Sequence, residues 1–330
     1  MENHMSKILI TGGSGFLGSH CIVAALAAGH EVCTTLRSLD KAGEVRAMLA
    51  AAGVDAKREV AFYEADLGND EGWSDAVAGC DYVLHTASPF PLTQPDDPND
   101  VIVPARDGTL RVLRAASHAG VRRVVLTSSF AAVGYGPEAP SHVFTEDDWT
   151  PIGAPNQPYI LSKAIAERAA WDFVKDRGTP ELSVVNPTGI FGPVLGPQLS
   201  TSIRIVKGLL EGAFPPELPD VWFGVVDVRD VADLHLQAMI DPSAAGERFI
   251  AVSGEPVSLL DVAAILRERF GERAARVPRR GVPTSSETNH RRSSSDKARQ
   301  RLDWKPRTSV EAIVASAESL IRLKLLETLN

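Results

Sequence analysis

The stretch ITGGSGFLGSH, residues 10–20, joins the end of an apolar, β-branched run to the start of a helical pattern. Two spacings typical of nucleotide-binding turns fit it: Gly12, Gly15 and Gly18, or Gly13, Gly15 and Gly18. In such turns glycine permits a tight bend, close approach of the backbone to a pyrophosphate, and close packing of helix on strand. The amino terminus of the helix adds N–H donors for the anion. The stretch therefore predicts a dinucleotide-binding turn, with Phe16 and Leu17 at its helical end.

Beyond this turn, β-branched runs alternate with helical patterns through the first half of the chain. Strands are expected at 7–11, 31–37, 60–65, 81–87, 123–129 and 182–187, and helices at 14–28, 40–52, 71–78, 100–119 and 157–176. Because the strands are apolar without polar alternation, they suit a parallel sheet that is buried on both faces. The pattern predicts an α/β fold in which residues 1–188 form a Rossmann-type, doubly wound sheet.

The second half of the chain is richer in glycine and proline, and its elements are more scattered. Residues 189–220 and 243–330 are predicted to form a smaller C-terminal substrate-binding lobe. Residues 221–242 are interpreted as one further strand–helix unit that returns to the main sheet, with Asp230 capping its helix. An amphipathic helix is expected at 308–327.

Composition narrows the possible partners. The 330 residues are 44% hydrophobic and 23% charged, with a net charge of -8, which favours neither nucleic acid nor a membrane surface as partner. No apolar run approaches the ~18 residues of a membrane span. Cys21, Cys33 and Cys80 are predicted to be reduced thiols, and the histidines show no metal-ligand spacing. We expect a cytoplasmic protein, a monomer or homodimer without a metal site, that starts at Met1 or Met5.

The end of the second predicted strand bears on the choice of dinucleotide. An acidic residue commonly accepts hydrogen bonds from the free ribose hydroxyls of NAD at this point. Here the sequence has Arg37, and a guanidinium suits a 2′-phosphate. Ser38 and Lys41 are expected to assist it. The alternative is a solvated Arg37 with Asp40 on the ribose, but we favour NADPH over NADH.

The stretch PYILSK, residues 158–163, places Tyr159 and Lys163 four positions apart in a predicted helix. Residues at this spacing share one helical face. They are either a proton-transfer pair or two solvated side chains. A free tyrosine titrates near ~10, and a neighbouring lysine cation lowers that pKa. The first interpretation therefore predicts that Lys163 makes Tyr159 usable as an acid.

These features together resemble the extended short-chain dehydrogenases/reductases, in particular the branch of dihydroflavonol reductases and bacterial aldehyde/ketone reductases. The likeness covers nearly the whole chain. It rests on TGGSGFLG at 11–18, LRS at 36–38, ADL at 65–67, HTASPF at 85–90, LTSSFAAV at 126–133, the Tyr159 and Lys163 pair, NPTGIFGP at 186–193 and VVDVRDVADLH at 225–235.

The resemblance implies a catalytic set of Ser129, Tyr159 and Lys163. It also implies these places along the cofactor: Asp66 and Leu67 at the adenine, Ala87 at the ribose, and Pro187 and Ile190 at the nicotinamide. In carbonyl reduction Tyr159 then supplies the proton, Ser129 hydrogen-bonds the oxygen, and Lys163 holds the nicotinamide ribose as well. Ser128 is a competitor of Ser129, and His85 is expected to be packed.

The substrate is expected to be an aldehyde, a ketone or the corresponding alcohol. Plant flavonoid reductases have an asparagine where this chain has Gly134, which argues against a flavonoid. NQPYILSK replaces the NWYCYGK of cinnamoyl-CoA reductases, which argues against a CoA thioester. Four aromatic residues are candidates for the substrate cavity: Phe90, Phe130, Tyr135 and Phe191. The alternative functions are an NAD-dependent nucleotide-sugar epimerase or dehydratase, and a non-catalytic NADP-binding sensor.

Overall fold

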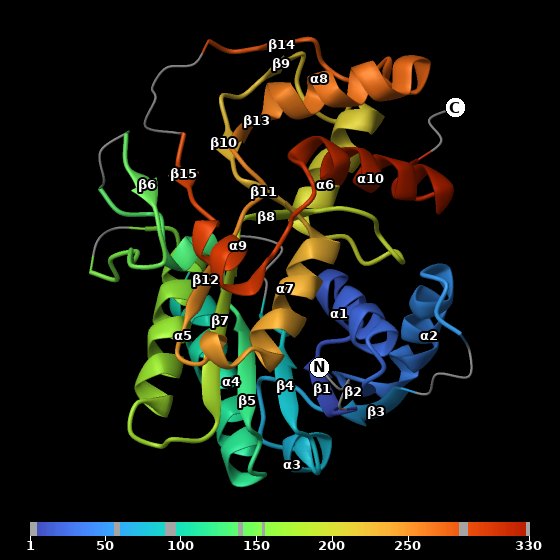
Figure 1. Ribbon diagram of the computed structural model, residues 1–330. Helices are drawn as coiled ribbons and strands as arrows, with labels where there is room; N and C mark the ends of the chain where they lie inside the picture. The colour runs from blue at the N-terminus through green and yellow to red at the C-terminus, as the bar shows by residue number, and fades with distance from the viewer. Residues whose placement is uncertain are drawn as a thin grey trace.

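A seven-stranded parallel sheet forms the centre of the protein (Figure 1). The computed structural model describes residues 5–55, 60–89, 97–137, 141–153, 156–283 and 290–327. From edge to edge the strands are β12 (Arg248–Ala251), β7 (Glu181–Pro187), β5 (Arg123–Thr127), β4 (Tyr82–His85), β1 (Lys7–Thr11), β2 (Glu31–Leu36) and β3 (Val60–Glu64). The first strand lies inside the sheet and the chain winds outward to both sides, which confirms the doubly wound prediction.

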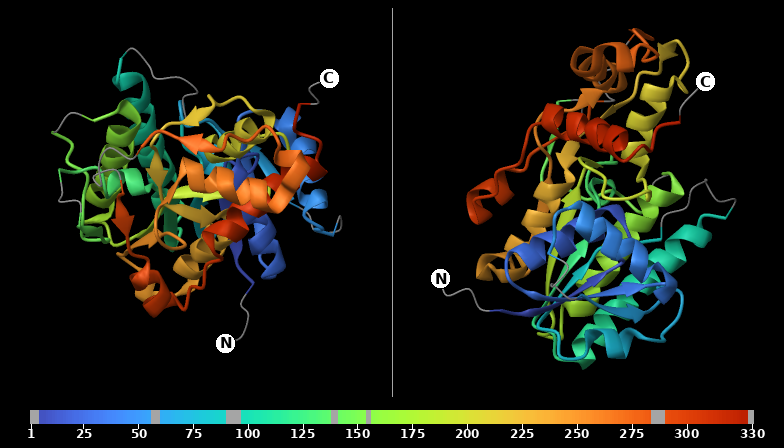
Figure 2. Two further views of the ribbon diagram at one scale, coloured as in Figure 1. Left: turned by 90° about the horizontal axis from the view of Figure 1, so that it is seen from above. Right: turned by 90° about the vertical axis from the view of Figure 1, so that its right-hand side faces the viewer.

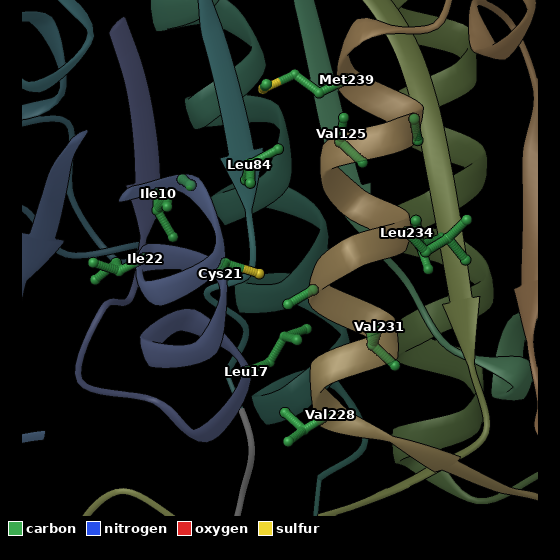
Figure 3. Close-up of a cluster of buried hydrophobic side chains, with 14 of the residues drawn as sticks. Ile10, Leu17, Cys21, Ile22, Leu84, Val125, Val228, Val231, Leu234 and Met239 are labelled. Atoms are coloured by element: carbon green, nitrogen blue, oxygen red, sulfur yellow. The ribbon is translucent and has the colours of Figure 1, made fainter. Parts of the chain in front are cut away.

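Helices cover both faces of this sheet. One face carries α1 (Phe16–Ala27), α2 (Ala42–Ala51) and α7 (Val228–Ile240), and the other carries α3 (Trp73–Val77), α4 (Asn99–His118) and α5 (Pro158–Val174). Successive strand residues point to opposite faces. Ile8 and Ile10 therefore pack with α1 and α7. Figure 3 shows Ile10 in this cluster, while Leu9 packs toward α3 and α4. This double burial explains why the strands lack polar alternation.

A second apolar core forms the smaller lobe. Its helices are α6 (Thr201–Glu211), α8 (Leu259–Phe270) and α10 (Ser309–Arg322). Short strand pairs accompany them: β8 (Gly189–Phe191) with β11 (Val225–Asp227), β9 (Glu217–Leu218) with β14 (Arg280–Gly281), and β10 (Trp222–Phe223) with β13 (Val257–Ser258). The described residues also include the pair β6 (Val143–Phe144) with β15 (Arg292–Ser293) and the helix α9 (Asp296–Leu302). Figure 2 shows α6, α8 and α10 gathered at one end of the sheet.

The division of the chain between sheet and lobe differs from the sequence-based boundaries in two strands, β12 and β11. The sequence assigns residues 243–330 to the lobe, but Arg248–Ala251 forms edge strand β12, paired with β7. Within 221–242, α7 does pack on the sheet, whereas β11 pairs with β8 outside it. Strand β12 thus takes the place beside β7, and β11 lies outside the main sheet.

The predicted cap of α7 was also one turn too late. Asp227 is the cap, and its carboxylate accepts a hydrogen bond from the backbone N–H of Arg229 at 2.9 Å. Asp230 lies inside the helix and is 3% exposed. Its carboxylate instead accepts a hydrogen bond from the backbone N–H of Arg307 at 2.6 Å, ahead of α10.

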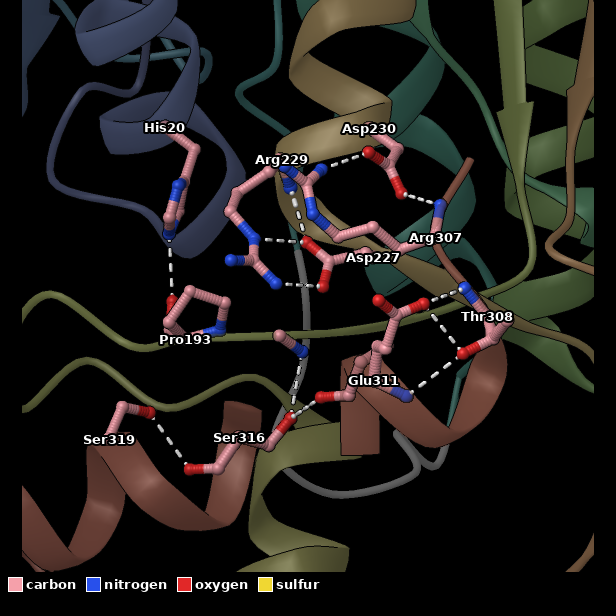
Figure 4. A network of polar contacts seen from close by, with 12 residues as sticks. His20, Pro193, Asp227, Arg229, Asp230, Arg307, Thr308, Glu311, Ser316 and Ser319 are labelled. Carbon is pink, nitrogen blue, oxygen red and sulfur yellow. Dashed lines mark hydrogen bonds and ion pairs between the residues drawn. The ribbon is translucent and has the colours of Figure 1, made fainter. Parts of the chain in front are cut away.

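Polar contacts join the lobe to the sheet domain (Figure 4). His20 of α1 lies with Nε2 2.8 Å from the carbonyl oxygen of Pro193. Val194, the residue after Pro193, donates its N–H to Ser319 Oγ of α10 at 2.9 Å. The segment after β8 is thus fixed between α1 and α10.

All three cysteines are buried free thiols, as the sequence predicts. The fold brings Cys33 and Cys80 together, with 3.6 Å between their sulfurs, although they are far apart in the chain. Across the part of the chain that the structure describes, no helix is both long enough and apolar enough to cross a membrane.

Candidate active site

The residues predicted to bind the cofactor follow the carboxyl ends of the parallel strands. The register pairs Thr11 with His85, which aligns the ends of β1 and β4. These two strands lie where the winding direction of the sheet reverses, and ligands of such folds bind in the crevice at this point. The candidate cofactor residues that follow these strands therefore lie at the carboxyl-terminal end of the sheet.

The glycine turn is packed too closely for any side chain. Gly12 has a φ of 71°, and Gly15 donates its N–H to the carbonyl oxygen of Gly12 at 2.9 Å. A Cβ on Gly18 would lie 2.4 Å from that same oxygen. Gly13 faces the other way, since its Cβ would meet Thr34 Oγ1 at 2.2 Å. Gly12, Gly15 and Gly18 thus form the cradle, and its open backbone beside the amino terminus of α1 fits a pyrophosphate.

Arg37 is exposed at the end of β2. Ser38 caps the short 3₁₀ helix η1 (Leu39–Lys41), with its hydroxyl accepting a hydrogen bond from the N–H of Asp40 at 3.3 Å. Lys41 ends this helix, so two cations lie close in sequence at the rim of the sheet. The arrangement suits a phosphate, although the carboxylate of Asp40 is exposed beside them.

Asp66 and Leu67 follow β3, at the same carboxyl-terminal end of the sheet. Asp66 Oδ1 accepts a hydrogen bond from the N–H of Gly68 at 2.6 Å, which fixes this loop. Leu67 packs on α4, because a Cβ on Gly108 would lie 2.9 Å from the Cβ of Leu67. Both residues are half-buried and present a partly apolar surface next to the end of β2.

Ala87 lies against the glycine turn. A Cβ on Gly12 would be 3.0 Å from the Cβ of Ala87, whose N–H donates to Thr11 Oγ1 at 3.0 Å. His85 Nδ1 lies 2.8 Å from the same hydroxyl oxygen. Burial, and next the charge of Lys163, lower the pKa of His85 to about 3. His85 is thus a neutral, packed side chain, as expected.

Tyr159 and Lys163 both face the interior. Lys163 is 8% exposed, and its Nζ lies 5.7 Å from the centroid of the Tyr159 ring. The ammonium donates to Ser88 Oγ at 2.8 Å. Ser129 contacts Tyr159 through a side-chain hydrogen bond. The pair is therefore not a solvated helix face, and Ser129 joins it. Ser88, one residue after Ala87, is a contact that spacing in the sequence did not single out.

The electrostatics differ from the expectation for Tyr159. Burial raises the pKa of Tyr159, and the hydrogen bond from Ser129 opposes that rise. Burial also lowers the pKa of Lys163 to about 8, against the attraction of Glu167. In the protein alone, the Ser129 hydroxyl is the group that favours the phenolate, and burial outweighs its effect on the Tyr159 pKa.

The two neighbouring serines have different partners. Ser128 is buried and donates its hydroxyl hydrogen to Glu167 Oε2 at 2.6 Å. Ser129 has extended backbone dihedrals, and its hydroxyl accepts a hydrogen bond from the N–H of Ala131 at 3.1 Å. Adjacent residues in extended backbone point to opposite sides. Ser129, which shares a side-chain hydrogen bond with Tyr159, is the serine on the side of the phenol.

Two of the aromatic candidates pack together: Phe130 is buried in a small apolar cluster, and Tyr135 lies against it. Phe130 and Tyr135 have ring centroids 6.1 Å apart. A Cβ on Gly134 would lie 2.1 Å from the Phe130 ring, so that ring occupies the place where an asparagine side chain would begin. Phe191 is fully buried and belongs to the lobe core, not to a cavity. Phe90 lies outside the described residues.

Pro187 and Ile190 lie at the exit from β7. Pro187 is buried and pairs with Ala251 of β12. Ile190 is half-buried on β8, where its carbonyl oxygen accepts a hydrogen bond from Ser202. Both lie where the chain passes from the sheet into the lobe.

Known proteins of the same architecture place this chain in a family. The NAD dependent epimerase/dehydratase family matches residues 8–251. The ketoreductase azaE of Aspergillus niger is 35% identical over 306 residues, covering 86% of this chain and 88% of that protein. The cinnamoyl-CoA reductase CAD2 of Medicago truncatula is 35% identical over 277 residues, covering 82% of each chain.

A solved structure agrees with these relatives. The yeast methylglyoxal/isovaleraldehyde reductase Gre2, complexed with NADPH, has a TM-score of 0.82 and 29% identity, covering 96% of this chain and 99% of that one. The family match extends from the first strand to the last strand of the central sheet. The chain therefore belongs to the NAD dependent epimerase/dehydratase family, the extended short-chain dehydrogenases/reductases.

Proposed function

We propose that this protein reduces the carbonyl group of an aldehyde or ketone with NADPH, and that Tyr159 donates the proton to the carbonyl oxygen. The protein is an NADP-dependent oxidoreductase of the family just named. One observation carries the proposal. Lys163 reaches Ser88, which is next to the Ala87 that packs on the glycine turn, so the proton-transfer group and the nucleotide turn meet in one place.

The residues at the carboxyl-terminal end of the sheet form the proposed cofactor site. The glycine cradle and the first turn of α1, with Phe16 and Leu17, bind the pyrophosphate. Arg37, Ser38 and Lys41 hold the 2′-phosphate through charge and a hydroxyl. Asp66 and Leu67 flank the adenine, Ala87 lies along the ribose, and Pro187 and Ile190 lie by the nicotinamide. Bound there, NADPH supplies the hydride for the carbonyl carbon.

The side chains of the chain itself handle the proton. The substrate oxygen gains negative charge as the carbon is reduced, and the hydroxyls of Ser129 and Tyr159 stabilise that charge by hydrogen bonds. Tyr159 then transfers its phenolic proton to the oxygen and is left as a phenolate. The ammonium of Lys163 stabilises this anion across the 5.7 Å to the ring. A proton from solvent restores the phenol.

The side chains next to the proposed active site bear on the choice of carbonyl substrate. Phe130 fills the place of the asparagine that flavonoid reductases carry, which removes a polar contact from this side of the site. We infer an aldehyde or ketone with an apolar or aromatic part that packs on Tyr135, which is half-buried against Phe130. Because a cinnamoyl-CoA reductase is a relative at 35% identity, a CoA thioester belongs in the test.

The test is the Tyr159→Phe variant, assayed with NADPH against aldehydes, ketones, a cinnamoyl-CoA thioester and UDP-sugars. The proposal predicts that wild-type protein consumes NADPH with aldehydes or ketones. Tyr159→Phe should lose on the order of 10²–10⁴ in kcat, because the proton donor is gone. NADPH affinity, measured by fluorescence titration, should stay within about twofold.

Tyr82→Phe is the matched control. Tyr82 is the first residue of β4, at the amino-terminal end of the parallel strands, whereas the site lies at their carboxyl-terminal end. The Tyr82→Phe variant should therefore keep full turnover. Retained turnover in Tyr159→Phe would remove the assigned proton donor. Conversion of UDP-sugars without net NADPH consumption would replace the proposal with an epimerase, and cofactor binding without any turnover would replace it with a sensor.

A further inference from the structure

A buried carboxylate lies one helical turn beyond Lys163. Glu167 of α5 is 1% exposed. Neither the spacing of the sequence motifs nor the proton transfer above gives it a role. A buried carboxylate is costly unless it is paired and hydrogen-bonded. Its partners therefore indicate what it does.

Two of these partners hold the backbone around Ser129. Glu167 Oε2 accepts hydrogen bonds from Ser128 Oγ at 2.6 Å and from Asn186 Nδ2 at 2.7 Å. Asn186 Nδ2 also donates to the carbonyl oxygen of Ser129 at 3.2 Å. The residue before Ser129 and the carbonyl of Ser129 itself are thus tied to the helix that carries Tyr159 and Lys163.

The other carboxylate oxygen pairs with a cation from the sheet edge. Arg248 of β12 donates from Nε to Glu167 Oε1 at 2.6 Å, and its side chain is 8% exposed. The guanidinium is itself fixed, since Nη1 donates to the carbonyl oxygens of Glu146 at 2.7 Å and Asp148 at 2.8 Å. It also lies 3.7 Å from the Trp149 ring centroid. The carboxylate is therefore held in place through both of its oxygens.

Glu167 and Lys163 also line the same small cavity. Its volume is about 20 Å³, and Ser88 and Ser128 line it as well. This is room for about one water molecule. The charged groups that face Lys163 are Glu167 on its own helix, with Tyr159 on that helix and His85 on β4 as its titratable neighbours. Arg248 is the cation that faces Glu167 from β12.

We propose that Glu167 is a positioning residue of this site: it fixes Ser129 through Ser128 and Asn186, and it keeps Lys163 charged across the shared cavity. The inference rests on the proposed reductase function and adds a group that touches neither substrate nor cofactor. Burial lowers the pKa of Lys163 to about 8, and the attraction of Glu167 raises it. Loss of the carboxylate charge therefore lets Lys163 lose its proton at a lower pH.

The experiment compares Glu167→Gln with the double variant Glu167→Gln/Arg248→Gln. The double variant is included because the single change leaves Arg248 buried without its counterion. In both, the alkaline limb of the kcat/KM profile for carbonyl reduction should move to lower pH by about one unit. At neutral pH kcat should fall at least about tenfold, because Ser129 is no longer held. Asp172→Asn, which removes an exposed carboxylate from the same helix, should change neither quantity.

Two further measurements separate position from charge. Ser128→Ala breaks the link to Ser129 and removes no charge, so kcat should fall while the alkaline limb stays in place. In cofactor-free protein, Glu167→Gln should melt at a lower temperature than the double variant, because only the single variant buries an unpaired guanidinium.

A folded double variant with the alkaline limb and kcat of wild type would overturn the inference. In that case the wild-type protein would still reduce carbonyl compounds, and the proposed function would stand. Wild-type protein that reduces none of them would instead overturn the proposed function, which keeps the two failures distinct.

Discussion

Gly18 is a residue at which one methyl group should decide cofactor binding. Its Cβ would lie 2.4 Å from the carbonyl oxygen of Gly12, in the turn that we propose binds the pyrophosphate. Gly18→Ala should weaken NADPH binding by about tenfold or more, because relieving such a contact costs about 1–3 kcal/mol and displaces the turn. Fluorescence titration with NADPH measures the change.

Gly43 provides the control. It lies in α2, and a Cβ there meets nothing within 4 Å. Gly43→Ala should leave NADPH binding unchanged and raise the free energy of unfolding by about 0.5–1 kcal/mol, because alanine has the higher helix propensity. Wild-type affinity in Gly18→Ala would mean that the cofactor does not bind at this turn.

For single residues, the sequence predicts which side chains lie close together better than it predicts the pKa shifts that result. The glycine motif and Ser129 come together because they follow strands whose carboxyl ends lie at the same end of the sheet, and α5 brings Tyr159 and Lys163 to that end. The direction of the Tyr159 pKa shift was missed, because it depends on burial by residues distant in the chain. Glu167 gave no signal of its own, since a glutamate in a helix reads as solvated until Arg248 is found beside it.

Among the elements, α10 depends on a cap that can be tested alone. Thr308 Oγ1 accepts a hydrogen bond from the N–H of Glu311 at 3.2 Å, and the Glu311 carboxylate accepts one in return from the N–H of Thr308 at 2.8 Å. Thr308→Ala should lower the free energy of unfolding by about 1 kcal/mol, the usual cost of an N-cap. Ser309→Ala, one residue into the helix, should change it by less than about 0.5 kcal/mol. Denaturant titration compares them, and equal effects would contradict the assigned cap.

The helix boundaries show where prediction from the sequence stops. Nearly every strand and helix of the first half lies where the apolar periodicity predicts it. The α7 cap was misplaced because two aspartates three positions apart both satisfy the local preference. Only the contact of Asp230 with Arg307, 77 residues away, distinguishes them. The position of β12 likewise depends on long-range pairing with β7, which local pattern does not contain.

For the whole molecule, buried histidines predict acid sensitivity. Burial lowers the pKa of His20 and His235 to about 4 and that of His85 to about 3. The unfolded chain takes up these protons near pH ~6.5, while the folded protein does not. Protons bound only by the unfolded state favour unfolding, so stability is complete above pH ~6.5 and is lost as the pH falls toward ~4. At pH 5 each of the three should cost on the order of 2 kcal/mol.

Denaturant titrations at pH ~7.5 and pH ~5 test this sensitivity. His20→Gln keeps an N–H donor for the carbonyl oxygen of Pro193 but cannot titrate, so its loss of stability between the two pH values should be smaller by about 2 kcal/mol. His118→Gln, at an exposed position at the end of α4, should show the full wild-type loss. If His20→Gln loses as much stability as wild type, His20 does not hold a lowered pKa, and the contact between α1 and the lobe does not contribute to the acid sensitivity.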